Sequence, residues 1–254
     1  MHQPTVRVIE ILELVLKSNT GLRLSDISKR LAIPKGTLLP ILNTLCGYKY
    51  LTRNDRDEYL GGIALLSLEN TLSSNYPILD FVRSEFEDMS EKFGETFYFG
   101  VLEDGYVLYL HKVDSTNPLR MLINTGRKLP AYATGIGKAL LTDKTYEELS
   151  TMYPCDLPPL TKNTVKTTKD LSLQLEEARK CGFSYEIEES MEHIRCFSVP
   201  VRKSGTIIAA ISVAIPTFRY NEADKDEIIE MLKEKAVSIG NIAEKTNTTF
   251  KNIF

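Results

Sequence analysis

A glycine-rich segment in the middle of the chain carries residue types suited to holding a small anion. Residues 133–138 read ATGIGK, and their two glycines stand where a helix is expected to begin. Backbone N–H groups at such a start form a concave cluster that suits a carboxylate. A nucleotide phosphate loop is not expected, because Tyr132 and Ala139 stand where that motif needs Gly and Ser or Thr. The alternative is a glycine-rich helix start that serves close packing.

A histidine and a cysteine later in the chain raise the question of nucleophilic or metal chemistry. His193 and Cys196 are three residues apart, and Glu188 and Glu189 come shortly before them. In a strand these two side chains would face opposite sides, and no third member of a catalytic set is in sight. No serine-nucleophile or zinc-protease motif occurs. We therefore expect no enzyme, no metal and no cofactor, with a metal site at these residues as the alternative.

The cysteines and the apolar runs of the sequence indicate the cellular compartment in which the protein is expected. The four cysteines are scattered along the chain, at Cys46, Cys155, Cys181 and Cys196. Without a C-x-x-C pair they are read as reduced thiols. No apolar run approaches the roughly 20 residues that span a bilayer. Because Glu10 and Glu13 interrupt the stretch that a signal peptide would need, we expect a cytoplasmic protein with no membrane partner.

The formal net charge of −3 hides an uneven distribution along the chain. The first 62 residues hold nine Lys and Arg against six Asp and Glu, a balance of +3, which leaves −6 for the remainder. A basic head joined to an acidic body is typical of a DNA-reading module attached to another domain. Since a balance of +3 is also common by chance, the charge alone does not identify such a module.

Three amphipathic segments in this head follow the order of a helix-turn-helix. Residues 6–16 place apolar side chains at helical spacing, and Ser25 is suited to cap a short helix over 25–31. A tight turn at 32–34 then leads into a third helix. Its apolar residues follow at intervals of three and four: Leu38, Ile41, Leu42 and Leu45.

A β-hairpin directly after the third helix is expected to form a wing. Residues 48–53 read as a strand, 54–57 as a turn and 58–60 as the return strand. This order puts Arg56 at the tip, from which it would reach the DNA backbone or the adjacent minor groove. We therefore expect a winged helix-turn-helix DNA-binding domain over residues 1–62.

The third helix carries candidate DNA contacts at its N-terminal end, the end that enters the major groove. We expect Lys35, Gly36, Thr37 and Leu39 to face base edges and phosphates. Pro40 removes one backbone hydrogen bond of this helix. Either the helix begins later than residue 35, or its first turn is kinked. The alternative function is a head that docks on another protein instead of DNA.

The pattern after residue 62 predicts a linker helix over 63–76 and a second domain over 77–254. Its strands arrive largely as consecutive pairs, so its sheet should be mainly antiparallel and flanked by helices, in the α+β class. We expect strands at 96–103, 106–113, 119–125, 183–189, 195–202 and 206–215, and helices at 78–93, 134–142, 145–152, 168–181 and near the C-terminus.

Several blocks of the chain, in the same order, resemble the IclR family of bacterial regulators. Residues 24–45 (LSDISKRLAIPKGTLLPILNTL) resemble the family's helix-turn-helix, and residues 126–141 (GRKLPAYATGIGKALL) resemble its most recognisable block. Residues 182–189, 195–201 and 209–216 resemble its last block. The resemblance covers nearly the whole chain. It implies a regulator that binds double-stranded operator DNA as a homodimer or tetramer.

The resemblance also implies a GAF-like effector-binding domain for small metabolites, often organic or aromatic acids. Matching positions give the effector-binding residues: Thr134, Gly135, Ile136, Glu186, Cys196, Ser198 and Ser212. Ser198 and Ser212 are expected to hydrogen-bond a ligand carboxylate, and Glu186 to accept from a ligand hydroxyl. Packing within the domain is the alternative role for each of them.

Three positions depart from the pattern of the resembled family. Gly36 stands where relatives usually carry Ser, and Pro40 where they commonly carry Arg, both on the DNA-reading helix. His193 replaces a usual glycine, at or near the pocket. We expect a repressor whose effector changes the spacing of the paired heads through the linker. A transcriptional activator of the same architecture is the alternative.

Overall fold

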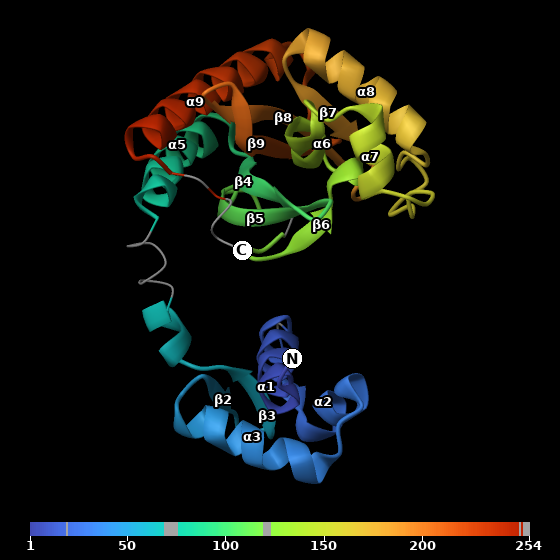
Figure 1. Ribbon diagram of the computed structural model, residues 1–254. Coiled ribbons are helices and arrows are strands. Elements are labelled where there is room, and N and C mark those ends of the chain that lie inside the picture. Colours follow the sequence, from blue (N-terminus) through green and yellow to red (C-terminus); the bar gives the residue numbers. More distant parts are fainter. Residues whose placement is uncertain (19, 69–75, 119–122, 249, 251–254) are drawn as a thin grey trace. The chain divides into compact units, whose positions relative to one another are not determined.

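The computed structural model describes the chain except for residues 19, 69–75, 119–122, 249 and 251–254. The chain divides into two compact units, Met1–Tyr76 and Pro77–Phe254, which are described separately below (Figure 1). None of the described helices is both long enough and apolar enough to cross a membrane.

The first unit has the order helix, strand, helix, helix and hairpin. Its elements are α1 (Gln3–Leu16), β1 (Leu22–Arg23), α2 (Leu24–Leu31), α3 (Lys35–Gly47), β2 (Leu51–Arg53) and β3 (Glu58–Gly61). One apolar side chain in three or four along each helix turns inward, and these side chains form a single core with the hairpin. Ile11, Ile27, Leu38 and Leu42 are fully buried there, with Tyr59 of β3 at 2% exposure.

The turn between α2 and α3 differs in detail from the prediction. Ser25 does not cap α2, because the helix already begins at Leu24. Asp26 instead accepts a hydrogen bond from the backbone N–H of Arg23 at 3.2 Å, which ties down the first turn. Ala32 ends the helix in the left-handed conformation (φ 52°), and this reversal turns the chain into α3.

Helix α3 begins at Lys35 and contains Pro40, so the prediction of a later start is wrong. Proline has no N–H, so the Gly36 carbonyl receives no hydrogen bond from position 40. Pro40 is exposed, as are Gly36 and Thr37, while Leu38 and Leu42 point into the core. The proline ring therefore lies on the solvent side of the helix, where it displaces no core side chain.

The wing is a three-stranded antiparallel sheet in the order β1-β3-β2. Strand β2 begins three residues later than predicted, after Lys49 takes a left-handed conformation (φ 62°). The two-residue strand β1 was not predicted. After the hairpin, residues 64–68 are helical, and residues 69–75 of the predicted linker helix lie outside the described residues.

The second unit is built on a six-stranded antiparallel sheet in the order β6-β5-β4-β9-β8-β7. Its strands are β4 (Thr96–Glu103), β5 (Tyr106–Val113), β6 (Lys128–Pro130), β7 (Ser184–Ile187), β8 (Ile194–Lys203) and β9 (Thr206–Pro216). Its helices are α5 (Pro77–Phe93), α6 (Gly135–Leu141), α7 (Tyr146–Met152), α8 (Thr168–Cys181) and α9 (Lys225–Lys245), with short 3-10 turns η1 (Ala131–Ala133) and η2 (Glu222–Asp224).

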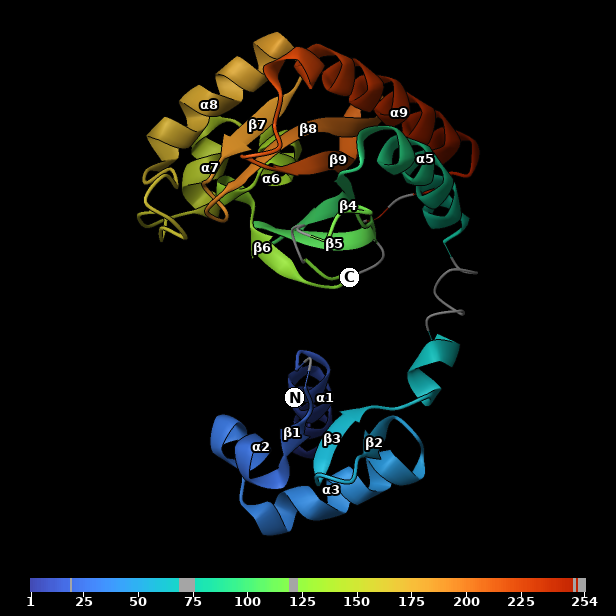
Figure 2. The same cartoon turned by 180° about the vertical axis from the view of Figure 1, so that it is seen from behind.

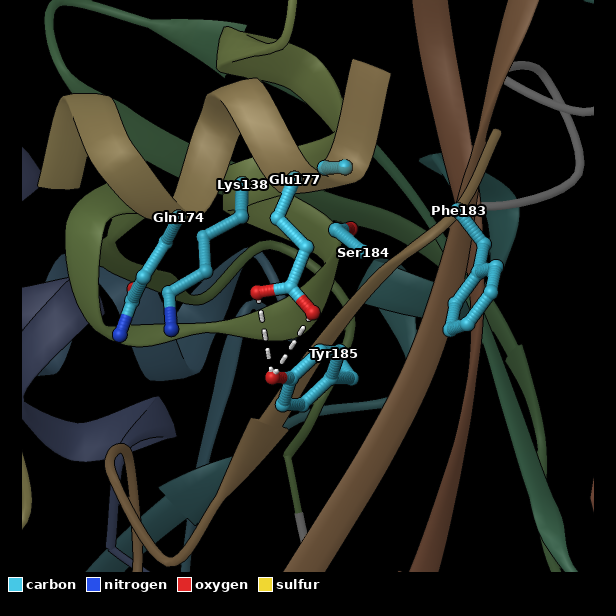
Figure 3. Close-up of a pocket in the computed structure, with 7 residues that line it drawn as sticks. Lys138, Gln174, Glu177, Phe183, Ser184 and Tyr185 are labelled. Carbon is cyan, nitrogen blue, oxygen red and sulfur yellow. Dashed lines mark hydrogen bonds between the residues drawn. The ribbon is translucent and has the colours of Figure 1, made fainter. Parts of the chain in front are cut away.

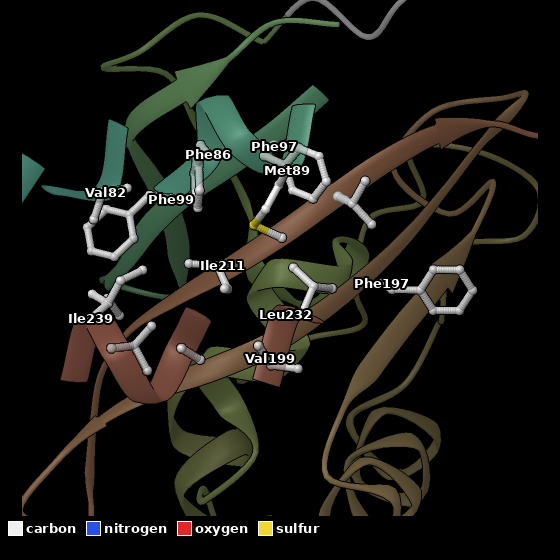
Figure 4. Close-up of a cluster of buried hydrophobic side chains, with 14 of the residues drawn as sticks. Val82, Phe86, Met89, Phe97, Phe99, Phe197, Val199, Ile211, Leu232 and Ile239 are labelled. Atoms are coloured by element: carbon white, nitrogen blue, oxygen red, sulfur yellow. The ribbon is translucent and has the colours of Figure 1, made fainter. Parts of the chain in front are cut away.

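Helices cover both faces of this sheet, with α5 and α9 on one face and α6, α7 and α8 on the other (Figure 1, Figure 2). The first face holds the larger apolar core, in which Phe86 of α5, Phe97 and Phe99 of β4, and Leu232 and Ile239 of α9 are fully buried (Figure 4). The period-two alternation of β4, β8 and β9 sends every second side chain to the other face. That face meets α6.

The predicted strand over 119–125 was wrong in its described part. Residues 119–122 lie outside the described residues, and residues 123–125 form no strand. The sixth strand is β6, a three-residue segment that pairs with β5, from Leu108 opposite Lys128 to Tyr106 opposite Pro130. A segment this short, which ends in Pro130, lacks the alternation that a sequence pattern can detect.

Candidate DNA-binding face and effector site

The first turns of α3 present the predicted DNA contacts on one exposed surface. Lys35, Gly36 and Thr37 are exposed, and Leu39 is 41% exposed although it is a large apolar residue. An added Cβ at Gly36 would meet no atom within 4 Å, so the surface is open at that point. These residues can reach a groove of nucleic acid because the core leucines occupy only the opposite face of the helix.

The wing tip is a tight turn fixed by one asparagine. Asn54 Oδ1 accepts from the backbone N–H groups of Arg56 and Glu58, each at 3.0 Å. Arg53 and Asp57 form an ion pair of 2.9 Å beside the turn, while the Arg56 side chain is exposed. The turn therefore presents the Arg56 guanidinium to solvent, as a contact with a DNA backbone would need.

In the second unit, the predicted effector loop is the start of α6. Thr134 Oγ1 accepts from the Gly137 N–H at 3.0 Å and so caps the helix. An added Cβ at Gly137 would lie 2.2 Å from the Ala131 carbonyl oxygen, so this glycine serves close packing. An added Cβ at Gly135 would lie 2.9 Å from Ser198 Oγ, so the loop backbone passes directly over the sheet.

The strand register brings the polar site residues together on the face that meets α6. Ser198 lies opposite Ser212 of β9 on one side and Ser184 of β7 on the other. Glu186 lies opposite Cys196 in the same way. All five side chains are buried to at least nine-tenths. Antiparallel partners point to the same face, so these groups form one polar cluster beneath the Thr134 loop.

Two hydroxyl groups of the cluster have weak or no partners. Ser198 Oγ is buried without a hydrogen-bond partner, and Ser212 Oγ lies 3.4 Å from the Val213 carbonyl oxygen. In contrast, Ser184 Oγ donates to the Gly135 carbonyl at 2.8 Å. A buried hydroxyl without a partner costs free energy unless a ligand or water completes it. Ser198 therefore has a buried hydroxyl whose hydrogen-bonding capacity no described residue satisfies.

Glu186 is the charged residue at the centre of the cluster, and it is fully buried. Its Oε1 accepts from Ser190 Oγ at 2.6 Å and from Cys196 Sγ at 3.4 Å, and its Oε2 accepts from the Glu189 N–H at 2.8 Å. Burial raises the pKa of Glu186, and these hydrogen bonds act against that rise. Burial also raises the pKa of the Cys196 thiol, which makes it a poor nucleophile.

Two tyrosines and an ion pair of the same region were not predicted. Tyr98 and Tyr109 of neighbouring strands are buried with their rings edge-on at 5.3 Å, and burial raises the pKa of Tyr109. Lys138 Nζ contacts Glu189 Oε1 at 2.5 Å. Period-two alternation could have placed the tyrosines on this face. No pattern could have found the ion pair, because its members lie 51 residues apart.

His193 does not belong to this polar cluster, and its place near an effector pocket stays a prediction. Its side chain is 79% exposed, and its ring nitrogen lies 3.8 Å from Glu188. Its backbone is left-handed (φ 64°), which explains why a glycine would suit this turn. Cys196 is buried, so the two do not approach each other as metal ligands. The described residues contain no group of three or more His, Cys, Asp or Glu placed to hold a metal.

A small cavity of about 10 Å³ lies behind Lys138, between α6, α8 and β7. Figure 3 shows the Lys138 and Gln174 side chains next to each other, and the Tyr185 hydroxyl donating to Glu177. Gln174 Oε1 is buried there without a hydrogen-bond partner. The space is about that of one water molecule. None of the predicted effector residues lines it.

A winged helix-turn-helix is the architecture of a DNA-binding transcription regulator, and here a sheet unit with a buried polar cluster follows it. The model for the "IclR helix-turn-helix domain" matches residues 4–55. The model for the "Bacterial transcriptional regulator IclR C-terminal" domain matches residues 70–241. The chain therefore belongs to the IclR family of bacterial transcriptional regulators, and the predicted resemblance and fold class are confirmed.

Individual relatives agree with this assignment over most of the chain. The transcriptional regulator KdgR of Dickeya chrysanthemi is 29% identical over 239 residues, which cover 93% of this chain and 78% of that protein. The transcriptional repressor AllR of Klebsiella pneumoniae is 28% identical over 243 residues, 93% of this chain and 88% of that protein. The families and these relatives are transcription regulators, not enzymes.

The fold is also that of a solved structure. The crystal structure of Thermotoga maritima IclR superposes with a TM-score of 0.79 at 24% identity, and the match covers 96% of this chain and all of that one. At this level of identity the likeness concerns the fold.

Proposed function

We propose that this regulator is a repressor that binds double-stranded operator DNA through α3 and the wing, and that a small organic acid in its second unit controls the binding. The observation that carries the first half is the exposed surface of Lys35, Gly36, Thr37 and Leu39 on α3, together with Arg56 at the wing tip. Their exposure takes no apolar side chain out of the core, because the core leucines lie on the opposite face of α3. Lys35 and Arg56 would neutralise phosphates, and Thr37 and Leu39 would face base edges.

The polar cluster beneath the Thr134 loop supports the second half of the proposal. The unpartnered Ser198 hydroxyl and the neighbouring Ser212 hydroxyl would donate to a ligand carboxylate. Gly135 and Ile136 would bring loop backbone against the ligand, because an added Cβ at Gly135 has no room beside Ser198. Thr134, Glu186 and Cys196 would complete the contacts with the ligand.

Assembly as a homodimer or tetramer is part of the same proposal. The first unit leaves large apolar side chains exposed on α1 and just after the wing: Ile9, Leu16, Ile63, Leu66 and Leu68, each between 47% and 66% exposed. A second copy would cover this surface through an isologous contact. Two copies would present two recognition helices to a palindromic operator, which one head cannot read.

The repressor assignment is supported by AllR, the 28% identical relative that is described as a repressor. An activator of the same architecture is the alternative within the family. The other alternative, a head that docks on a protein, predicts different behaviour of the exposed basic residues, because protein docking does not depend on the release of phosphate counterions.

The test is DNA binding across a salt series. The probe is a double-stranded fragment from upstream of the chain's own gene, and the variants are Lys35→Ala and Arg56→Ala. Each should weaken binding and lower the slope of log affinity against log salt by about 1, as expected for one lost phosphate contact. Lys180→Ala, an exposed lysine of α8 in the second unit, is the matched control and should change neither quantity.

Two results would count against the DNA-binding proposal. One is the absence of salt-dependent binding by the unaltered chain. The other is a pair of variants that bind the fragment with the same affinity and the same salt slope as the unaltered chain, since a head that docks on protein would behave in that way.

A further inference from the structure

Three ionisable side chains lie buried together beside the predicted effector site. Lys138 of α6 is 2% exposed, Glu189 after β7 is 7% exposed, and Glu186 of β7 is fully buried. Two carboxyl groups and one ammonium group thus share one region of the interior. With all three ionised, this region would carry a net charge of −1, which is costly in a low-dielectric environment.

The geometry assigns the ammonium group to one carboxylate only. Lys138 Nζ contacts Glu189 Oε1 at 2.5 Å, and Glu189 Oε2 also accepts from the Val165 N–H at 3.4 Å. The partners of Glu186 are instead the Ser190 hydroxyl, the Glu189 N–H and the Cys196 thiol. None of these three donors carries a positive charge.

Among the titratable groups that face Glu186 from the neighbouring elements, the positive charge belongs to Lys138, which is already paired with Glu189. Cys196 lies on β8 and Tyr109 on β5, and burial raises the pKa of both groups, which keeps them neutral at neutral pH. The positive charge of Lys138 on α6 favours the ionised form of Glu186, but Glu189 forms an ion pair with Lys138 and balances that charge. Burial is also the largest influence on the pKa of Glu186, which it raises.

We propose that Glu186 is protonated in the resting protein at neutral pH, so that Lys138 and Glu189 balance each other and the cluster is neutral. The Ser190 hydroxyl still donates to Oε1 at 2.6 Å, which leaves the carboxyl proton for another acceptor. In this state Glu186 does not repel an anion, and it can donate a hydrogen bond to a ligand oxygen. The expectation from the sequence was the reverse, that Glu186 accepts from a ligand hydroxyl.

This inference rests on the proposed function, because Glu186 matters to an effector only if the cluster binds one. It deepens that proposal by assigning the ligand chemistry: an anion with an oxygen acceptor turned toward Glu186. Lys138 and Glu189 are then positioning residues. Glu189 contacts Glu186 through its backbone N–H, and the pairing of Glu189 with Lys138 sets the charge state of Glu186.

Infrared spectroscopy of the full chain at pH 7 tests the charge state without ligand or DNA. A buried protonated carboxyl group gives a carbonyl band separate from that of carboxylates. We expect this band in the unaltered chain and its loss in Glu186→Gln. Glu148→Gln is the matched control, because Glu148 is exposed and accepts a hydrogen bond from Lys144, which holds the pKa of Glu148 below its usual value. That variant should keep the band.

The two members of the ion pair should move the band in opposite directions. Glu189→Gln leaves Lys138 with Glu186 as its only buried carboxylate, so Glu186 ionises and the band is lost. Lys138→Met leaves two carboxyl groups without a cation, so both are protonated and the band grows roughly twofold. A merely structural pair would change stability in both variants without these opposite shifts.

A missing band in the unaltered chain, or a band that persists in Glu186→Gln or in Glu189→Gln, would overturn the inference. Glu189→Gln keeps the size of the side chain, so it decides the matter even if Lys138→Met does not fold. Failure of the proposed function would appear separately, in the DNA-binding series, because the infrared band requires neither partner.

Discussion

At the scale of single residues, His111 shows how the interior of the second unit constrains charge. The residue lies on β5, its ring is 6.4 Å from that of Phe86, and its Nε2 is buried without a hydrogen-bond partner. Burial, followed by the nearby Arg83, lowers the pKa of His111 from 6.5 to about 4, and Asp80 opposes this shift. The folded protein therefore holds His111 neutral where the unfolded chain would protonate it.

This shift predicts a loss of stability in mild acid. Between pH 6.5 and about 4 the unfolded chain binds more protons at this position than the folded protein, so the free energy of unfolding falls as the pH falls through that window. His111→Phe, which removes the titration next to Phe86, should show a smaller loss over the same range. Denaturant midpoints measured from pH 7 to pH 4 test the difference.

The control for this measurement is His2→Gln, which removes an exposed histidine. It should reproduce the pH dependence of the unaltered chain. If His111→Phe loses as much stability in acid as the unaltered chain does, His111 is not the group responsible.

The sequence predicted which residues belong to the polar cluster beneath the Thr134 loop, but it did not predict their charge state. Ser198, Ser212 and Glu186 could be chosen by their match to a family motif, and the strand register brings them to one face. Their charge state depends on Lys138 and Glu189. The pairing of these two residues is set by how a turn after β7 packs on α6, and no local pattern encodes that contact.

At the scale of elements, helix α3 has a well-packed core face, but its solvent face carries residues that disfavour a helix. Leu38, Leu42 and Leu45 anchor the helix in the core, while Gly36 and Pro40 reduce its intrinsic stability on the exposed side. Most of the helix stability therefore comes from tertiary packing. A surface that binds DNA can tolerate this, because the core side chains already fix the direction of the helix.

We predict that Pro40→Ala stabilises α3 by about 1–3 kcal/mol, because it restores an N–H that can donate to the Gly36 carbonyl and removes the clash of the ring with that carbonyl. Slower hydrogen exchange of the amides of Leu42 and Leu45 measures the gain. Asn43→Ala, at an exposed position of the same helix, is the control and should have a much smaller effect. Unchanged or faster exchange in Pro40→Ala would show that the proline is not a defect of this helix.

Element types could largely be predicted where the periodic pattern is long. The helices α5 and α8 and the strands β4, β5, β8 and β9 follow their predicted spans closely, because each shows a clear period of 3.6 or 2. The strands β1 and β6 have two and three residues, too few for a period to appear. The start of α2 was set by Asp26 bonding back to Arg23, a capping contact that competed with the Ser25 cap.

At the scale of the whole molecule, the chain joins a basic head to an acidic second unit, and we propose that a ligand in the second unit controls DNA binding by the first. The ligand need not touch DNA. It only has to favour one arrangement of paired heads over another, since two half-sites are read at a fixed spacing. Coupling of this kind predicts that ligand and DNA each weaken the binding of the other by the same factor.

The most direct measurement is DNA affinity of the full chain, by fluorescence anisotropy on its own upstream fragment, with and without organic acids that raise its melting temperature. We predict salt-dependent binding that such an acid weakens. Gly135→Ala, whose added Cβ would lie 2.9 Å from Ser198 Oγ, should bind the fragment normally and not respond to the acid. Absent DNA binding, or an acid that stabilises the protein and leaves its DNA affinity unchanged, would contradict the claim.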